Sequence, residues 1–235
     1  MLHGMSQASE STTTASKEAG PSTIILLIRH GQTPTTGQVL PGRAPGLHLA
    51  DRGQEQARDV AQRIEGLELS AIYSSPMLRA QETAAPTIDA QGLKAQLADS
   101  LIECDFGAWT GKKLSELNKL PEWKEVQNSP STFRFPEGES FVEMQQRMVD
   151  GIEEIASAHP GEVVAAFSHA DTIKAAVAHF VGTPLDSFQR IHIDTASISA
   201  VEFTKDGMRM LVTNSRTGSL AYLRPKDAAP KDGAQ

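Results

Sequence analysis

Two short apolar runs dominate the hydrophobic pattern of this chain. Residues 24–28 are five consecutive aliphatic side chains, and residues 163–167 form a second unbroken apolar run. Strands covered on both faces, as in a parallel sheet between layers of helices, show runs of this length without polar alternation. The pattern therefore predicts two central strands.

Segments with helical spacing alternate with the predicted strands. Helices are expected at 57–64, from 77 onward, at 141–155 and at 170–180. Further strands are expected at 71–74, 197–204 and 208–214, with an extended segment at 97–102. Pro86 should limit or kink the second helix, and Ser140 with Glu143 forms a capping box that should start the third. The alternation predicts an α/β fold, a three-layer α/β/α sandwich around a mostly parallel mixed sheet.

A single folded domain is expected over residues 23–224. Residues 1–22 and 225–235 have the polar, low-complexity composition of disordered tails, and the first lacks the apolar stretch of a signal peptide. The segment 110–135 has a weaker pattern, with aromatic residues set among polar ones. We expect it to be a lid-like excursion over a crevice rather than part of the core.

Composition argues against several classes of protein. The formal net charge is −7, from 22 basic and 29 acidic residues. Because duplex binding depends on clustered Lys and Arg, nucleic acid is not an expected partner. No apolar stretch approaches the roughly 20 residues of a membrane span, so no membrane partner is expected. The single cysteine, Cys104, leaves no internal disulfide, and a cytoplasmic location is the expectation.

Cationic and imidazole side chains stand where predicted strands end. Arg29 and His30 follow the first apolar run, and His169 follows the second. Arg79 opens the helix after another strand, and Glu103 follows the extended segment. The carboxyl ends of parallel strands share one edge, where ligands of α/β proteins bind, and guanidinium and imidazole groups there suit phosphate chemistry. The alternative is that these are ordinary strand ends whose polar side chains reach water.

These residues lie within or between six short segments of the chain. They are LIRHGQT at 27–33, GQEQA at 53–57, YSSPMLRAQETA at 73–84, ECDFGAWTG at 103–111, PEGES at 136–140 and SH at 168–169. Together they resemble the histidine phosphatase superfamily, also called the phosphoglycerate mutase-like family. The segment 106–111 is similar to the phosphatase branch of that family rather than to its cofactor-dependent mutases.

The resemblance implies a role for each of five residues. His30 would be the nucleophile that becomes phosphorylated, with Arg29, Arg79 and His169 around the phosphoryl oxygens. Glu103 would protonate the departing alkoxide and then deprotonate the attacking water. His30 must be neutral to attack, a cationic His169 would help to hold the dianion, and the pKa of Glu103 must be raised. No metal ion and no other cofactor is implied.

The expected activity is metal-independent hydrolysis of a small phosphorylated metabolite by a histidine acid-type phosphatase. Substrate contacts are expected from Arg29, Gln32, Thr33, Arg43, Arg79 and His169. A phosphoglycerate mutase-type phosphotransferase is one alternative, because it would use the same catalytic residues. A non-enzymatic module that binds a phosphorylated ligand is the other. The sequence selects no particular substrate, and a homodimer is compatible with it.

Overall fold

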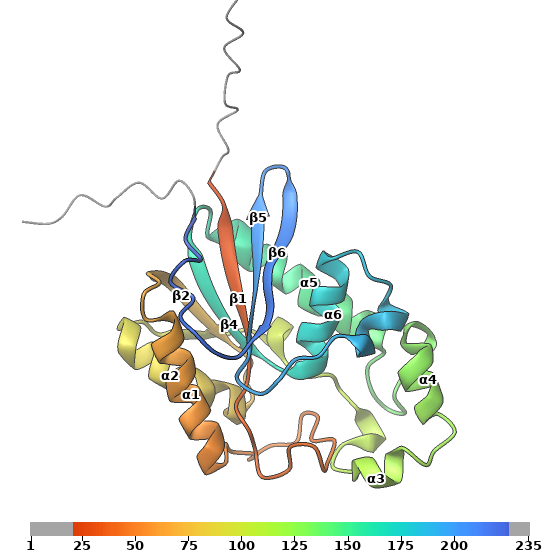
Figure 1. The fold of residues 1–235 in the computed structure, drawn as a ribbon. Helices are drawn as coiled ribbons and strands as arrows, with labels where there is room; N and C mark the ends of the chain where they lie inside the picture. Colours follow the sequence, from red (N-terminus) through yellow and green to blue (C-terminus); the bar gives the residue numbers. More distant parts are fainter. Residues whose placement is uncertain (1–20, 226–235) are drawn as a thin grey trace, which may run out of the picture.

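A six-stranded sheet runs through the middle of the protein, in the order β3-β2-β4-β1-β5-β6 (Figure 1). The strands are β1 (Thr23–Arg29), β2 (Leu69–Ser74), β3 (Ala95–Leu97), β4 (Val163–Ser168), β5 (Ile198–Thr204) and β6 (Gly207–Ser215). Strands β1 to β4 pair in parallel, whereas β5 runs antiparallel to both β1 and β6. The predicted mostly parallel mixed sheet is confirmed.

The computed structural model describes residues 21–225, so the expected tails at 1–22 and 225–235 lie almost entirely outside the described residues. Within the described residues the α-helices are α1 (Asp51–Ile64), α2 (Leu78–Gln91), α3 (Leu114–Leu117), α4 (Trp123–Asn128), α5 (Phe141–Ala158) and α6 (Ala170–Phe180). Short 3-10 helices lie at Asp99–Leu101, Gly107–Trp109, Pro130–Thr132 and Leu185–Arg190. None of the helices in this part of the chain is long and apolar enough to cross a bilayer.

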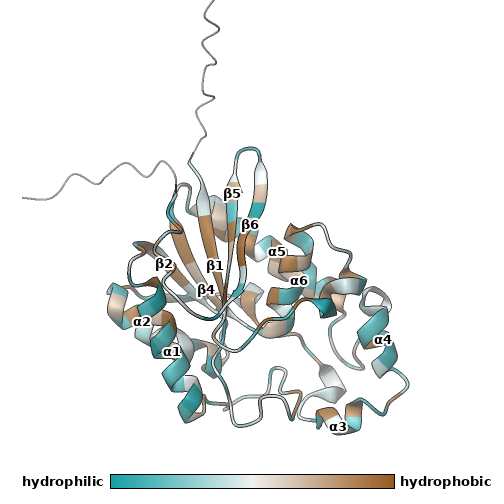
Figure 2. Ribbon diagram, viewed as in Figure 1, coloured by the Kyte–Doolittle hydropathy of each residue, from teal (hydrophilic) through white to brown (hydrophobic). Residues whose placement is uncertain are grey.

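Helices α1 and α2 cover one face of the sheet, and α5 and α6 cover the other (Figure 1). Alternate side chains of β1 enter the two resulting cores: Ile24, Leu26 and Ile28 pack with α1 and α2, whereas Ile25 and Leu27 pack with α5 and α6. Figure 2 shows the result as largely brown central strands beside a teal outer face on α1. The predicted three-layer sandwich is therefore confirmed, and double-sided burial explains the unbroken apolar run.

Two expected boundaries are wrong, the end of the second helix at Pro86 and the extent of the segment 97–102, whereas a kink at Pro86 stays a prediction. Helix α2 continues past Pro86 to Gln91 and ends at Gly92, whose φ of 64° is the left-handed conformation common at helix ends. A proline removes one backbone donor, and packing of α2 on α1 and on the sheet outweighs that loss. The extended segment at 97–102 is also shorter than expected, because β3 ends at Leu97 and a 3-10 helix, Asp99–Leu101, follows.

The segment 110–135 contributes to a third apolar cluster, contrary to the expectation that it lies outside the core. Trp109, Phe133, Phe135 and Phe141 are all buried. Phe135 stands at the centre, with ring centroids 5.0 Å from Phe133 and 5.2 Å from Phe141. Aromatic side chains in edge-to-face contact bury much area with few residues, so a weak sequence pattern is sufficient to form a core here.

Candidate active site

His30 and His169 directly follow the neighbouring parallel strands β1 and β4. The strands are parallel neighbours, with Arg29 opposite Ser168, so His30 and His169 leave the sheet side by side. Their ring centroids are 5.2 Å apart. The side chains do not reach water as ordinary strand ends would, since His30 is 5% exposed and His169 is 0% exposed.

His30 is held in the tautomer that a nucleophile needs. Its Nδ1 lies 2.7 Å from the carbonyl oxygen of Gly31. A carbonyl can only accept, so Nδ1 carries the hydrogen and Nε2 of the neutral ring carries the lone pair. Burial first, and then the charges of Arg79 and Arg29, lower the pKa of His30 well below its usual value. The ring is therefore neutral at physiological pH.

Two arginines bring positive charge to the histidine pair. Arg79 is fully buried and donates from Nη2 to the carbonyl of Gly42 at 2.9 Å. Arg29 donates from Nη1 to the carbonyl of Ile193 at 2.7 Å. Burial lowers the pKa of both guanidinium groups, and the Glu103 carboxylate raises it. Arginine keeps its charge in such settings, so both groups can hold an anion.

Several donors in this cluster have no hydrogen-bond partner in the protein. Among the buried side-chain atoms of the described residues, these include Arg29 Nε, Arg79 Nε and Arg79 Nη1, and the ring nitrogen His169 Nδ1 also has no hydrogen-bond partner. Buried donors are nearly always paired, so a group of unpaired ones calls for an explanation. A phosphoryl group offers several acceptor oxygens to such donors at once.

The charge of His169 is set mainly by burial. Its Nε2 lies 2.8 Å from the hydroxyl of Ser75. Burial, followed by the charges of Arg79, His30 and Arg29, lowers the pKa of His169 well below its usual value. Without a bound phosphate the ring is therefore neutral, mainly because it is buried and next because of the two guanidinium groups, and a cationic His169 beside a phosphoryl dianion stays a prediction. A neutral imidazole can still donate one N–H to a phosphoryl oxygen.

Glu103 has the electrostatic properties of a proton donor at neutral pH. Its Oε1 accepts from the backbone N–H of Cys104 at 2.9 Å, and its Oε2 is 3.8 Å from His169 Nδ1. Burial, and next the carboxylate of Asp171, raise the pKa of Glu103 to about 7, against the opposing effect of Arg79. A carboxyl group that is partly protonated at neutral pH can both give and take a proton.

Close contacts between glycines fix the loop that carries His30. A Cβ on Gly31 would lie 2.6 Å from the carbonyl oxygen of Gly53, and one on Gly53 would lie 2.1 Å from that of Gln32. The start of α1 can approach this loop so closely only because both residues lack side chains. Gln56 adds a hydrogen bond, since its Oε1 accepts from the backbone N–H of Gln32 at 2.8 Å.

Sequence reasoning missed two hydroxyl groups that order the site. Ser75 contacts His169, as described above, and Thr83 accepts from the backbone N–H of Gly31 at 2.9 Å while donating to the carbonyl of Arg79 at 2.6 Å. Both lie in the segment 73–84, which carries Arg79. Their only signal was this position within a segment that resembles the family.

The remaining predicted substrate contacts have different surroundings. The side chain of Gln32 is exposed. Thr33 is buried, and its hydroxyl lies 3.0 Å from that of Thr36. The guanidinium group of Arg43 donates to protein oxygens, including the carbonyl of Glu103 at 2.8 Å. Substrate binding by these residues stays a prediction.

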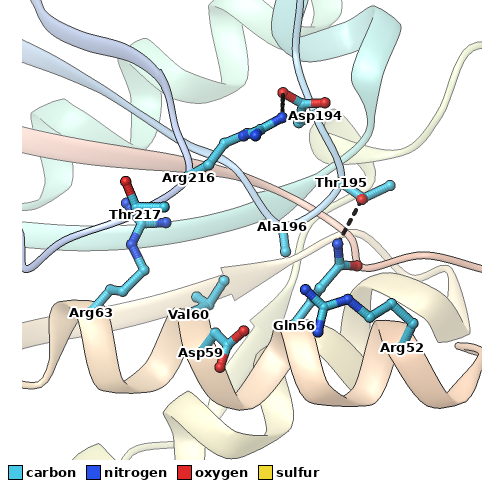
Figure 3. A pocket seen from close by; sticks show the side chains of 10 residues that line it. All are labelled: Arg52, Gln56, Asp59, Val60, Arg63, Asp194, Thr195, Ala196, Arg216 and Thr217. Carbon is cyan, nitrogen blue, oxygen red and sulfur yellow. Dashed lines mark hydrogen bonds and ion pairs between the residues drawn. The ribbon is translucent and has the colours of Figure 1, made fainter.

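A separate cavity of about 360 Å³ lies next to the strand ends (Figure 3). It is lined by one side of α1, by residues 194–196 and by residues 216–217, and it includes none of the five predicted catalytic residues. Its arginines already have protein acceptors: Arg52 pairs with Glu55, Arg216 pairs with Asp194, and Arg63 donates to backbone carbonyls of residues 215 and 218. The cavity is therefore distinct from the phosphate-type site, by which we mean the cluster of His30, His169, Arg29 and Arg79.

The described residues also contain no cluster of His, Cys, Asp and Glu arranged to hold a metal ion.

Comparison with known proteins gives consistent results. Residues 25–216 match the histidine phosphatase superfamily (branch 1). "Phosphoserine phosphatase 1" of Hydrogenobacter thermophilus is 31% identical over 182 residues, which cover 75% of this chain and 85% of that protein. "Probable phosphoglycerate mutase GpmB" of Erwinia tasmaniensis is 29% identical over 181 residues, which cover 76% of this chain and 84% of that protein.

A solved structure extends the comparison to three dimensions. The Bacillus stearothermophilus protein YhfR superposes with a TM-score of 0.78 at 27% identity, covering 83% of this chain and 98% of that one. The shared fold and the family match point to the same family as the six sequence segments do. The chain belongs to the histidine phosphatase superfamily.

Proposed function

We propose that this protein hydrolyses phosphate monoesters of small metabolites through a phosphohistidine at His30. The observation that carries the proposal is a neutral imidazole, with its Nε2 lone pair available, among unpaired guanidinium donors of Arg29 and Arg79 and the unpaired ring nitrogen of His169. Membership of a family of phosphatases and phosphoglycerate mutases supports it. Apart from the substrate and the attacking water, the proposed mechanism uses five side chains, those of Arg29, His30, Arg79, Glu103 and His169.

In the first step Nε2 of His30 attacks phosphorus and the bond from phosphorus to the ester oxygen breaks. The two guanidinium groups and the N–H of His169 hold the three equatorial oxygens, where charge resides in the transition state. The protonated carboxyl of Glu103 gives its proton to the departing alkoxide. The products are the alcohol, phosphohistidine and a Glu103 carboxylate.

In the second step the Glu103 carboxylate takes a proton from water. The resulting hydroxide attacks phosphorus, and the bond between phosphorus and Nε2 breaks. Inorganic phosphate leaves, His30 is neutral again, and Glu103 is protonated for the next cycle. A pKa near neutrality lets one carboxyl group serve both steps, which fits the raised pKa of about 7.

The two alternatives remain distinct from this proposal. A mutase would keep the phosphoryl group and return it to a second hydroxyl, but the segment 106–111 is similar to the phosphatase branch. A binding module would need no proton donor, and the buried carboxyl of Glu103 with its raised pKa argues for catalysis. A cytoplasmic location and a homodimer are further proposals that rest on composition and family resemblance alone.

Release of inorganic phosphate from a panel of phosphomonoesters tests the proposal. The panel includes phosphoserine, sugar phosphates and phosphoglycerates, and His30→Ala should lower kcat/KM by roughly 10⁴-fold or more, as loss of a nucleophile does elsewhere. Interconversion of phosphoglycerates after priming with bisphosphoglycerate, without phosphate release, would favour a mutase. Tight binding of phosphorylated compounds without turnover by the wild type would favour a binding module.

A further inference from the structure

Three side chains from distant parts of the sequence hold the main chain on both sides of Glu103. Arg147 of α5 donates from Nη1 to the carbonyls of Ser100 at 2.8 Å and Ile102 at 3.0 Å. Arg43 donates from Nε to the carbonyl of Glu103 itself at 2.8 Å. Glu139 accepts from the backbone N–H of residue 105 at 3.1 Å. We call Arg43, Glu139 and Arg147 the acid-loop clamp.

The three members of the acid-loop clamp are bonded to one another. Arg147 donates from Nε and Nη2 to the two carboxylate oxygens of Glu139, at 2.9 and 3.0 Å. Arg43 donates from Nη2 to the same carboxylate at 3.1 Å. The side chain of Glu139 is only 12% exposed, so these contacts are largely shielded from water. Forked arginine–carboxylate pairs fix orientation as well as distance.

The clamp also connects the proton donor to the phosphate-type site. The carbonyl of Gly42 accepts from Arg79 Nη2 at 2.9 Å, and the next residue, Arg43, bonds to the carbonyl of Glu103. Gly42 has a φ of +50°, and a Cβ there would lie 2.8 Å from the Thr110 hydroxyl. This tight turn therefore sets the spacing between a phosphate-binding arginine and the acid.

We propose that the acid-loop clamp positions the Glu103 carboxyl group for proton transfer, and that Arg43 is a positioning residue rather than a substrate contact. The inference rests on the proposed phosphatase function. The Glu103 carboxyl bonds to the backbone of the adjacent residue, Cys104, so its location follows the main chain that the clamp holds. Proton transfer requires hydrogen-bond reach, and a misplacement of about 1 Å can cost about 100-fold in rate.

The dependence of rate on leaving group tests the proposal. Arg43→Lys keeps the charge without the fork, and Glu139→Gln keeps the shape without the charge. In single-turnover phosphorylation of His30, both variants should be ~10- to 100-fold slower with an alkyl phosphate, whose alkoxide needs the proton. With dinitrophenyl phosphate, whose phenolate leaves unprotonated, the loss should stay within about threefold. Glu103→Gln should show the same selectivity, to a larger extent.

Arg209→Gln is the matched control, because Arg209 pairs with Glu202 between β5 and β6, away from the described catalytic residues. It should match the wild type with both substrates. Arg147→Lys is the second variant if Glu139→Gln fails to fold, as judged by cooperative thermal unfolding. Equal slowing of both substrates, or a raised KM at unchanged kcat, would overturn the positioning role. A wild type that never phosphorylates His30 would overturn the proposed function instead.

Discussion

The two halves of the proposed active site are built in different ways. The phosphate-binding half stands on regular structure: β1 ends at Arg29, β4 ends at Ser168, and their ladder places His30 beside His169. The proton-donor half stands on an irregular loop around Glu103, whose backbone is held by side chains from elsewhere. The strand ladder therefore fixes the two histidines side by side, whereas the position of the Glu103 loop depends on long-range side-chain bonds.

The sharpest separation of the two halves comes from Glu103→Gln. Glutamine keeps the shape of the side chain but cannot donate or take the proton, so turnover of alkyl phosphates should fall by ~10²- to 10⁴-fold. Binding of inorganic phosphate should change little, because the guanidinium groups remain. Steady-state kinetics and product inhibition by phosphate measure the two effects. Retention of near wild-type turnover would remove Glu103 from the proposed mechanism.

The apolar support of the proton-donor half can be tested with Phe135→Ala. Phe135 is 1% exposed, and its ring centroid is 4.9 Å from that of Phe106, within the acid segment 103–111. Removing a buried phenyl ring typically costs ~3–5 kcal/mol of unfolding free energy. Chemical denaturation measures this cost, with Leu97→Ala at an exposed position as the control, expected within about 0.5 kcal/mol of wild type. A loss at Phe135 as small as that at Leu97 would contradict the third core.

The phosphate-binding half should respond to Gly53→Ala. The added Cβ would lie 2.1 Å from the carbonyl of Gln32, so the nucleophile loop must move. We expect a ~10- to 100-fold loss of kcat/KM, equal for alkyl and dinitrophenyl phosphates because attack on phosphorus is impaired in both. Gln54→Ala, on an exposed position of α1, is the control. A loss confined to alkyl phosphates would mean that the two halves are not separable.

The smallest expected effect is a shift in pH dependence with Asp171→Asn. The free enzyme needs protonated Glu103, so kcat/KM for an alkyl phosphate should fall as pH rises through about 7. The Asp171 carboxylate raises this pKa, so its removal should lower the pKa and move the alkaline fall to lower pH. Comparison with Asp89→Asn, at an exposed position of α2, cancels the ionisation of the substrate. An unchanged or upward-shifted fall would contradict the assigned cause.

Sequence patterns were sufficient to place the two histidines of the phosphate-binding half together, although not the hydroxyl groups of Ser75 and Thr83 that contact it. Unbroken apolar runs indicated central strands, and parallel strands share an edge, so convergence of His30 and His169 followed from their positions. The capping box at Ser140 is present with both of its hydrogen bonds, because a cap depends only on residues three positions apart. Local patterns of this kind need no knowledge of distant contacts.

The contacts that hold the proton-donor half could not be predicted from such patterns. The bonds from Arg43 and Arg147 to the loop around Glu103 join residues more than forty positions apart, and no periodicity marks them. The neutral state of His169 depends on burial and on Arg79, which only the folded arrangement reveals. The roles of all five catalytic residues stay proposals until they are measured.

Identification of the phosphorylated atom tests the central claim most directly. The protein is mixed with a phosphomonoester that it hydrolyses, and the reaction is quenched in alkali within the first turnover. Peptide mass spectrometry then locates the phosphorylated residue. The account predicts a phosphoryl group on the imidazole of His30, formed and lost at rates that support turnover, and absent from His30→Ala. A phosphoryl group on another residue, or turnover with no covalent phosphoenzyme, would contradict it.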